Sequence, residues 1–196
     1  RGPGPDTPLR GPEAARALLA SALVEKVAQA ERRIFLLLAV LYPDADMEQI
    51  FAGIHDAAAV DAPRRRANAT ELLDNLLDRN VKRRFLPLLE ELPRPKKLEL
   101  VAEMYAPRPR DGRTVLTELC RDETAWVRSC AVLCLSQLAE VPPELAELLA
   151  SSTNDVNAVV RESALVALAR ASPLRAREIA ESRLRDEAPV VRRQAA

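Results

Sequence analysis

The stretch that decides the fold is a ten-residue phrase that occurs three times: DETAWVRSCA at 122–131, DVNAVVRESA at 155–164 and DEAPVVRRQA at 186–195. In each copy an Asp stands six residues before an Arg, a Val directly precedes that Arg, and an Ala follows it by three residues. The Arg-to-Arg steps are 33 and 31 residues. A fixed period of roughly 20–50 residues is typical of stacked repeat units. The sequence therefore predicts a repeat architecture, which offers a surface to a partner.

The composition favours helices over strands. Hydrophobic residues make up 48% of the 196-residue chain and aromatic residues only 3%, whereas β-sandwich strands prefer β-branched and aromatic side chains. Ala, Leu, Glu and Arg are abundant, and all four are good helix formers. No stretch alternates between apolar and polar residues as a half-buried strand does. We predict an all-α chain: an α-solenoid, a superhelix of antiparallel helix pairs.

Proline and glycine positions predict how the chain is organised. Residues 1–12 hold four of the 15 prolines and three of the five glycines, which indicates a flexible linker. We expect an N-terminal helical cap over 13–60, made of a long helix that ends before Pro43 and a shorter one that Asp44 or Asp46 caps. The array over 61–196 continues the cap as one domain. Its expected helices cover about 61–77, 81–92, 98–105, 111–121, 124–139, 143–151, 157–171, 174–185 and from 189 onward.

The repeated phrase has a structural interpretation. An Asp at the turn between two helices can cap the second helix, and the Arg on that helix can bond the neighbouring unit's Asp or carbonyl groups. A weaker copy of the phrase begins at Asp61, where the Asp precedes its Arg by five residues. We predict a ladder that holds the repeats in register, formed by Asp61, Arg66, Asp122, Arg128, Asp155, Arg161, Asp186 and Arg192.

This pattern resembles the HEAT repeat, including its short-period form of the PBS-lyase type, over about residues 60–196. The first half carries a second resemblance, in ERRIFLLLAVLYP at 31–43, RANATELLDNLL at 66–77 and KRRFLPLLEE at 82–91. These phrases are similar to the soluble HEAT-repeat tail of bacterial proteins related to ATP/ADP (NTP/NDP) exchange transporters. That resemblance implies a cytoplasmic module on the cytosolic face of a membrane. Because the sequence starts with Arg and stops within a repeat, we expect a piece of a longer protein.

Residues for catalysis or metal binding are scarce. A single histidine, His55, excludes His-based triads and multi-His metal sites. Cys120, Cys130 and Cys134 lack an obvious fourth metal ligand, and free cysteines are often buried, so we expect small core residues. The five glycines form no phosphate-binding loop. The sequence predicts no catalytic residue, no cofactor and no metal.

The charge balance bears on partners. The 29 basic and 29 acidic side chains cancel, which disfavours nucleic-acid binding driven by phosphate neutralisation. The longest apolar run, nine residues at 34–42, is too short to span a bilayer, so membrane attachment is expected only through a missing parent domain. Trp126 aligns with Val159 and Val190 and has two interpretations, core packing or an interaction hot spot. The possible interaction patch comprises Arg79, Lys82, Arg83, Arg84 and Trp126.

These features predict a non-catalytic helical-repeat scaffold, related to armadillo-like helical proteins. Its partner is expected to be a protein or a neighbouring domain of the same parent chain. The alternative is a HEAT-like enzyme or accessory protein, similar to a bilin lyase or to a DNA-repair glycosylase. A glycosylase needs a basic groove with aromatic side chains, which a neutral chain with one Trp and two Tyr fits poorly.

Overall fold

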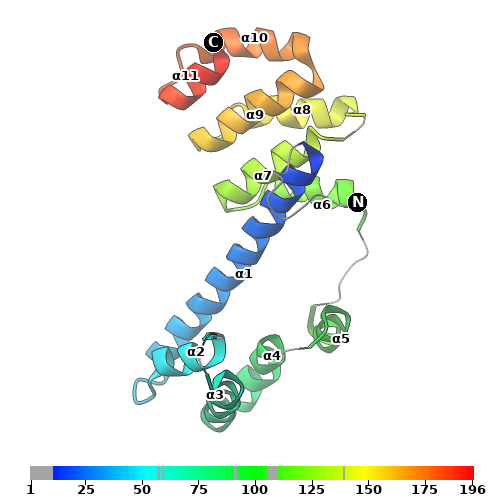
Figure 1. Ribbon diagram of the computed structural model, residues 1–196. Coiled ribbons are helices and arrows are strands. Elements are labelled where there is room, and N and C mark those ends of the chain that lie inside the picture. The colour runs from blue at the N-terminus through cyan, green and yellow to red at the C-terminus, as the bar shows by residue number, and fades with distance from the viewer. Residues whose placement is uncertain (1–10, 57, 59, 91, 106–109, 139) are drawn as a thin grey trace. The chain divides into compact units, whose positions relative to one another are not determined.

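The computed structural model describes residues 11–56, 58, 60–90, 92–105, 110–138 and 140–196, and these residues form α-helices and no β-strand (Figure 1). The prediction of an all-α solenoid is confirmed. None of the described helices is long and apolar enough to cross a membrane. The helices are α1 (Pro12–Leu41), α2 (Met47–His55), α3 (Ala62–Leu76), α4 (Arg79–Leu89), α5 (Arg94–Tyr105), α6 (Gly112–Leu119), α7 (Ala125–Leu135), α8 (Pro143–Ser152), α9 (Ala158–Ala171), α10 (Pro173–Arg183) and α11 (Pro189–Ala195).

Aspartate caps set several helix starts. Asp46 accepts a hydrogen bond from the backbone N–H of Gln49 at 2.9 Å and so caps α2. Asp78 and Asp111 cap α4 and α6 in the same way, each through N–H groups of the first turn. The Asp78 cap explains why α4 begins before Val81, the start predicted from the apolar pattern. Helix α5 also begins earlier than predicted, at Arg94, because a proline in the first turn loses no helical hydrogen bond.

The described chain forms two compact units. Unit 1 consists of the described residues within 1–26 and 110–196. Unit 2 consists of the described residues within 27–109. Helix α1 belongs to both, because the division falls between Lys26 and Val27. The predicted linker over 1–12 lies outside the described residues except for Gly11 and Pro12. The predicted cap over 13–60 and array over 61–196 stay a prediction.

Unit 1 is a two-layer stack of helix pairs. The second helices α7, α9 and α11 pack side by side in chain order, and the first helices α8 and α10 are also in contact (Figure 1). The Val before each phrase Arg is at most 1% exposed: Val127, Val160 and Val191. Ala131 and Ala164 are fully buried, which lets the second helices approach closely. Small and aliphatic residues therefore fill this core.

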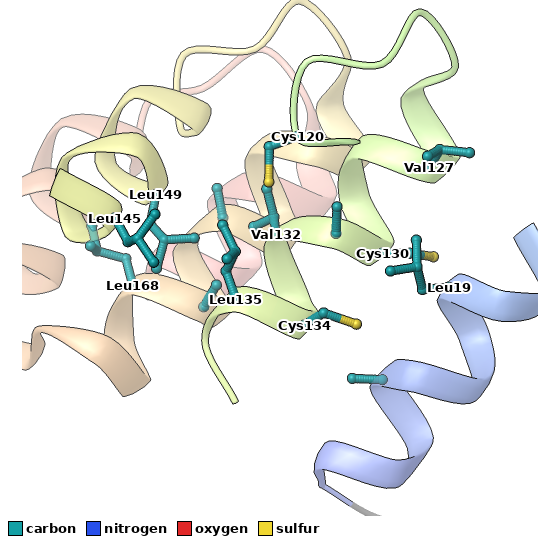
Figure 2. Packing of buried hydrophobic residues seen from close by; sticks show 14 of the residues in the cluster. Leu19, Cys120, Val127, Cys130, Val132, Cys134, Leu135, Leu145, Leu149 and Leu168 are labelled. Carbon is teal, nitrogen blue, oxygen red and sulfur yellow. The ribbon is translucent and has the colours of Figure 1, made fainter. Parts of the chain in front are cut away.

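The cysteines of unit 1 belong to this core. Figure 2 shows Cys130 and Cys134 on α7 facing Leu19 of α1, with Cys120 at the end of α6. All three are free and buried. Burial raises the pKa of Cys120 to about 12 and that of Cys134 to about 11, so neither thiol ionises near neutral pH. They behave as small apolar side chains.

Unit 2 is packed around aromatic rings. Phe35 lies edge-on to Phe51 and to Phe85, with ring centroids 5.1 and 5.5 Å apart. Such edge-to-face pairs add stability beyond area burial. Helices α2 and α3 approach closely at Gly53, where a Cβ atom would lie 3.1 Å from that of Ala69. Three large rings and one close helix contact thus define the core of unit 2.

Candidate functional site

Each repeated phrase places an Asp in the turn before the second helix of a pair. Asp155 accepts a hydrogen bond from the backbone N–H two residues later at 2.8 Å, and Asp122 and Asp186 do the same at 2.8 and 2.9 Å. These bonds stabilise the turn, since an Asp can bond its own backbone two residues on. The residues at the helix N-cap positions are Thr124, Asn157 and Ala188. The Asp therefore orders the turn and is not the helix cap that the sequence predicts.

The Arg of one phrase reaches the Asp of the next. Arg128 donates through Nε and Nη2 to the two carboxylate oxygens of Asp155, both at 2.8 Å. Arg161 donates in the same way to Asp186 at 3.0 and 2.7 Å. These bidentate pairs join consecutive repeats, and charge-assisted pairs of this geometry are among the stronger hydrogen bonds.

The remaining edge of each guanidinium is held by its own turn. Nη1 of Arg128 donates to the carbonyl oxygens of Asp122 and Glu123 at 2.8 and 3.1 Å. Nη1 of Arg161 donates to those of Asp155 and Val156 at 3.0 and 3.2 Å. Arg128 and Arg161 are therefore each bonded on two sides, to the turn behind and to the aspartate ahead.

These pairs are shielded from water to different degrees. The side chains of Arg161 and Asp186 are 7% and 4% exposed, and those of Arg128 and Asp155 are 14% and 15% exposed. Hydrogen bonds from Arg161 hold the pKa of Asp186 below its usual value. Burial pushes the pKa of Asp155 upward, but the hydrogen bonds it accepts from Arg128 outweigh burial and lower that pKa. Both carboxylates are therefore ionised at neutral pH.

The weaker phrase in unit 2 has a different geometry. Arg66 donates to the carbonyl oxygen of Ile54 at 2.7 Å and also to that of Leu89. The side chain of Asp61 accepts no capping hydrogen bond from α3, although its carbonyl oxygen accepts the N–H of Arg65 at 3.0 Å. The structure thus places Arg66 between backbone carbonyls of its own unit.

The residues of the predicted interaction patch fall in both units. Arg79, Arg83 and Arg84 are exposed on α4 of unit 2, and Lys82 beside them forms an ion pair of 3.3 Å with Asp74. Trp126 belongs to α7 of unit 1. We therefore treat Trp126 separately from the basic residues of α4.

Trp126 is one of three residues that we call the exposed row, together with Val159 and Val190. They occupy equivalent positions on α7, α9 and α11, two residues before the phrase Arg, and these helices are neighbours. Trp126 is 45% and Val159 42% exposed, and Val190 is half-buried. Sequence reasoning aligned the three positions but did not separate exposure from packing. The sequence does indicate it: the adjacent Val127, Val160 and Val191 occupy the core-facing side of each helix, so the residue before each of them faces another direction.

Metal binding has no cluster of ligands in the described residues. They contain no group of three or more His, Cys, Asp or Glu side chains that could hold a metal ion. The Nε2 atom of His55 lies 3.9 Å from a carboxylate oxygen of Glu31, and its ring packs against Phe51 at 4.4 Å between centroids. His55 thus contributes to the surface of the unit 2 core.

The comparisons with known proteins agree with the repeat geometry. A family model described as HEAT repeats matches residues 69–169, slightly more than half of the 196-residue chain. No curated protein and no solved structure matches. The family match concerns the repeats alone, and the relationship of residues 14–92 to nucleotide transporters stays a prediction.

Proposed function

The chain belongs to the HEAT-repeat family, and we propose from this that it is a non-catalytic scaffold that binds a protein segment at its exposed row. One observation carries the proposal: three consecutive repeats present an apolar side chain to solvent at the same position. Trp is enriched among the residues that dominate binding energy at interfaces. Stacked repeats also supply the extended surface on which such proteins bind partners.

The rigidity of unit 1 supports the same role. The Arg128 and Arg161 pairs tie each repeat to the next, so the spacing between Trp126 and Val159 is fixed before a partner arrives. A surface that is ordered in advance loses less conformational entropy on binding. The partner best suited to this row is an extended or helical segment with apolar side chains spaced to meet successive repeats.

Affinity purification from cell extract, with three forms of the chain as bait, tests the proposal. Trp126→Ser removes the largest side chain of the exposed row. Leu174→Ser is the matched control, because Leu174 is an apolar residue that is 83% exposed and lies on α10, the first helix of its pair. We expect the unchanged chain and the Leu174 variant to retain the same protein, and the Trp126 variant to lose it. Equal retention by all three would exclude the row as the binding surface.

Fluorescence of the chain supplies an independent reading, since Trp126 is the only tryptophan. Its side chain is 45% exposed, so a partner that covers it will move its emission to shorter wavelength. A purified partner that binds without changing this emission would contradict the proposed site. The reading needs no substitution and therefore separates loss of binding from loss of folding.

A finer part of the proposal concerns the parent protein. The phrases at 31–43, 66–77 and 82–91 support attachment of this module to a transporter-like membrane domain. The test is the coding sequence on both sides of this segment. Several apolar segments of about 20 residues encoded upstream would support the attachment, and a parent without them would contradict it.

A further inference from the structure

The part of helix α1 that belongs to unit 2 is apolar on two opposite sides. Phe35 and Leu38 are each 3% exposed and belong to the core of this unit. Leu37 and Val40 are 65% and 79% exposed. They lie on the other side of the helix, because successive helical residues are rotated by about 100°. The core of unit 2 therefore accounts for only one of the two apolar sides.

The second side is a continuous aliphatic surface. We call its four residues, which are between 59% and 79% exposed, the outer face of α1: Leu36, Leu37, Val40 and Leu41. The ring of Phe35 contacts those of Phe51 on α2 and Phe85 on α4, so these helices pack on the opposite side and leave the outer face accessible. Contiguous apolar surface that stays exposed is typical of an interaction site.

Opposite charges stand at the two ends of the outer face. Arg33 lies four residues before Leu37, and Asp44 lies four residues after Val40, in the turn that follows α1; both charged residues are exposed. The C-terminal end of a helix adds partial negative charge on the Asp44 side. A lipid surface matches this arrangement poorly, because helices that lie on membranes surround their apolar face with Lys and Arg. A partner with the same charges in reverse order matches it well.

A second copy of the chain provides that reverse order. Arg33, Leu37, Val40 and Asp44 are separated by four, three and four residues, which reads the same in both directions. This is the spacing of residues along the seam between two packed helices. Two antiparallel copies of α1 place Leu37 of one copy opposite Val40 of the other and Arg33 opposite Asp44, and a two-fold axis makes each contact twice. A parallel pair would instead bring the two Arg33 side chains together.

We propose that two copies of this chain associate through the outer face of α1 in antiparallel orientation, with Arg33 of each copy paired with Asp44 of the other. The association is weak, because a standard interface buries about 800 Å² on each partner and an outer face of about two helical turns offers less. This surface belongs to unit 2 and goes beyond the proposed function of the exposed row. Failure of one of the two proposals therefore leaves the other standing.

Sedimentation equilibrium of the 196-residue chain measures the association. We expect the apparent mass to rise from 21.6 kDa toward twice that value at concentrations of about 10–100 μM, as for a small interface. Val40→Ser places a polar group in both central contacts and should raise the dissociation constant at least about tenfold. Leu72→Ser is the matched control, because Leu72 is a 56% exposed residue on α3 of the same unit. A chain that stays monomeric up to about 1 mM would overturn the proposal.

Charge exchange tests the antiparallel orientation. Arg33→Asp places carboxylates opposite each other at both ends of the seam, and Asp44→Arg places guanidinium groups there. Each single variant should therefore weaken the association about tenfold. The double variant combines Arg33→Asp with Asp44→Arg, restores opposite charges at both ends and should associate as the unchanged chain does. A double variant no stronger than the single variants would contradict the pairing.

Vesicles test the alternative occupant of the outer face. We expect the chain to remain in the supernatant when vesicles of phosphatidylcholine and phosphatidylglycerol are sedimented. Binding to these vesicles that Val40→Ser abolishes, by a chain that forms no dimer, would assign the outer face to a lipid surface and overturn the proposal.

Discussion

Units 1 and 2 use the same kind of Arg in different ways. In unit 1, Arg161 joins two repeats through the carboxylate of Asp186. In unit 2, Arg66 donates to backbone carbonyls on either side of it, at Ile54 and Leu89. In unit 1 the aspartate recurs with the period of the repeat and meets the Arg of the preceding phrase. In unit 2 the Arg reaches the carbonyl oxygen of the last residue of α4, so the regular Arg-to-Asp spacing is a feature of unit 1, where charge pairs connect the repeats.

The cores differ in the same sense. Unit 2 centres on the ring of Phe35, which contacts two other phenylalanines, whereas the buried core of unit 1 contains aliphatic and small residues and leaves Trp126 outside. We infer that unit 2 depends on a few large side chains and unit 1 on its connections between repeats. Two spectroscopic signals separate them, since the only tryptophan lies in unit 1 and both tyrosines, Tyr42 and Tyr105, lie in unit 2.

The largest expected effect is the loss of the central ring of unit 2. Phe35 is 3% exposed, and truncation of a buried Phe to Ala removes about 4 kcal/mol through lost burial and the cavity left behind. We expect Phe35→Ala to lower the denaturant midpoint followed by tyrosine fluorescence and to leave that followed by Trp126 nearly unchanged. Leu37→Ala is the matched control, because Leu37 lies on the same helix and is 65% exposed. Equal shifts of both signals would show that the units unfold as one and would break the comparison.

The second largest effect is expected from loss of the most buried Arg–Asp pair of unit 1. Arg161→Ala removes both side-chain hydrogen bonds from the carboxylate of Asp186, which is only 4% exposed, and leaves it the longer contact with Arg183 at 3.8 Å. Removal of one member of a buried pair costs about 3 kcal/mol. The denaturant midpoint followed by Trp126 fluorescence should fall, and the midpoint followed by tyrosine fluorescence should stay the same. Arg170→Ala, at the exposed end of the same helix, should change stability by less than about 0.5 kcal/mol. A similar loss of stability in both variants would mean that the Arg161–Asp186 pair contributes no more to stability than a surface charge does.

The pairing of Arg128 with Asp155 and of Arg161 with Asp186 can be inferred from the sequence because a period of about 31–33 residues places equivalent groups at consecutive turns. The partner of Asp122 cannot be inferred in this way. Lys26 belongs to no copy of the phrase and lies 96 residues away. Contacts of that kind depend on how a non-repeating helix packs, which the repeat period does not encode.

The exposed row illustrates a second limit. Adjacent helical residues are rotated by about 100°, so Trp126 and Val127 face different directions. Trp is the larger side chain, and size alone favours placing it in the core, yet Val127 is fully buried and Trp126 is 45% exposed. The Ala three residues after each Arg marks the face of the helix that points to the core. Trp126 lies away from that face, so the pattern assigns it to the surface.

Acid should weaken unit 1 before unit 2, as a third test. The pKa values of Asp155 and Asp186 are lowered in the folded chain, whereas an unfolded Asp titrates near about 3.9. The pairs thus stabilise the fold fully above that value, and the contribution is lost as pH falls through the lowered folded pKa. Below about pH 4, we expect the denaturant midpoint followed by Trp126 fluorescence to fall. Asp186→Asn should flatten this dependence, and an unaltered pH profile in that variant would contradict the role of the pair.

The smallest expected effect concerns a neutral contact between repeats in unit 1. The hydroxyl groups of Ser129 on α7 and Ser163 on α9 form a buried hydrogen bond of 2.6 Å. Ser163→Ala leaves the Ser129 hydroxyl without this partner and should cost about 1 kcal/mol. Replacing both by Ala removes both polar groups together and should recover most of that loss, since two apolar groups of similar shape need no hydrogen bond. A double variant that is weaker than either single variant would mean that the hydroxyl pair stabilises the stack as the charged rungs do, and the contrast between charged and neutral connections would have to be abandoned.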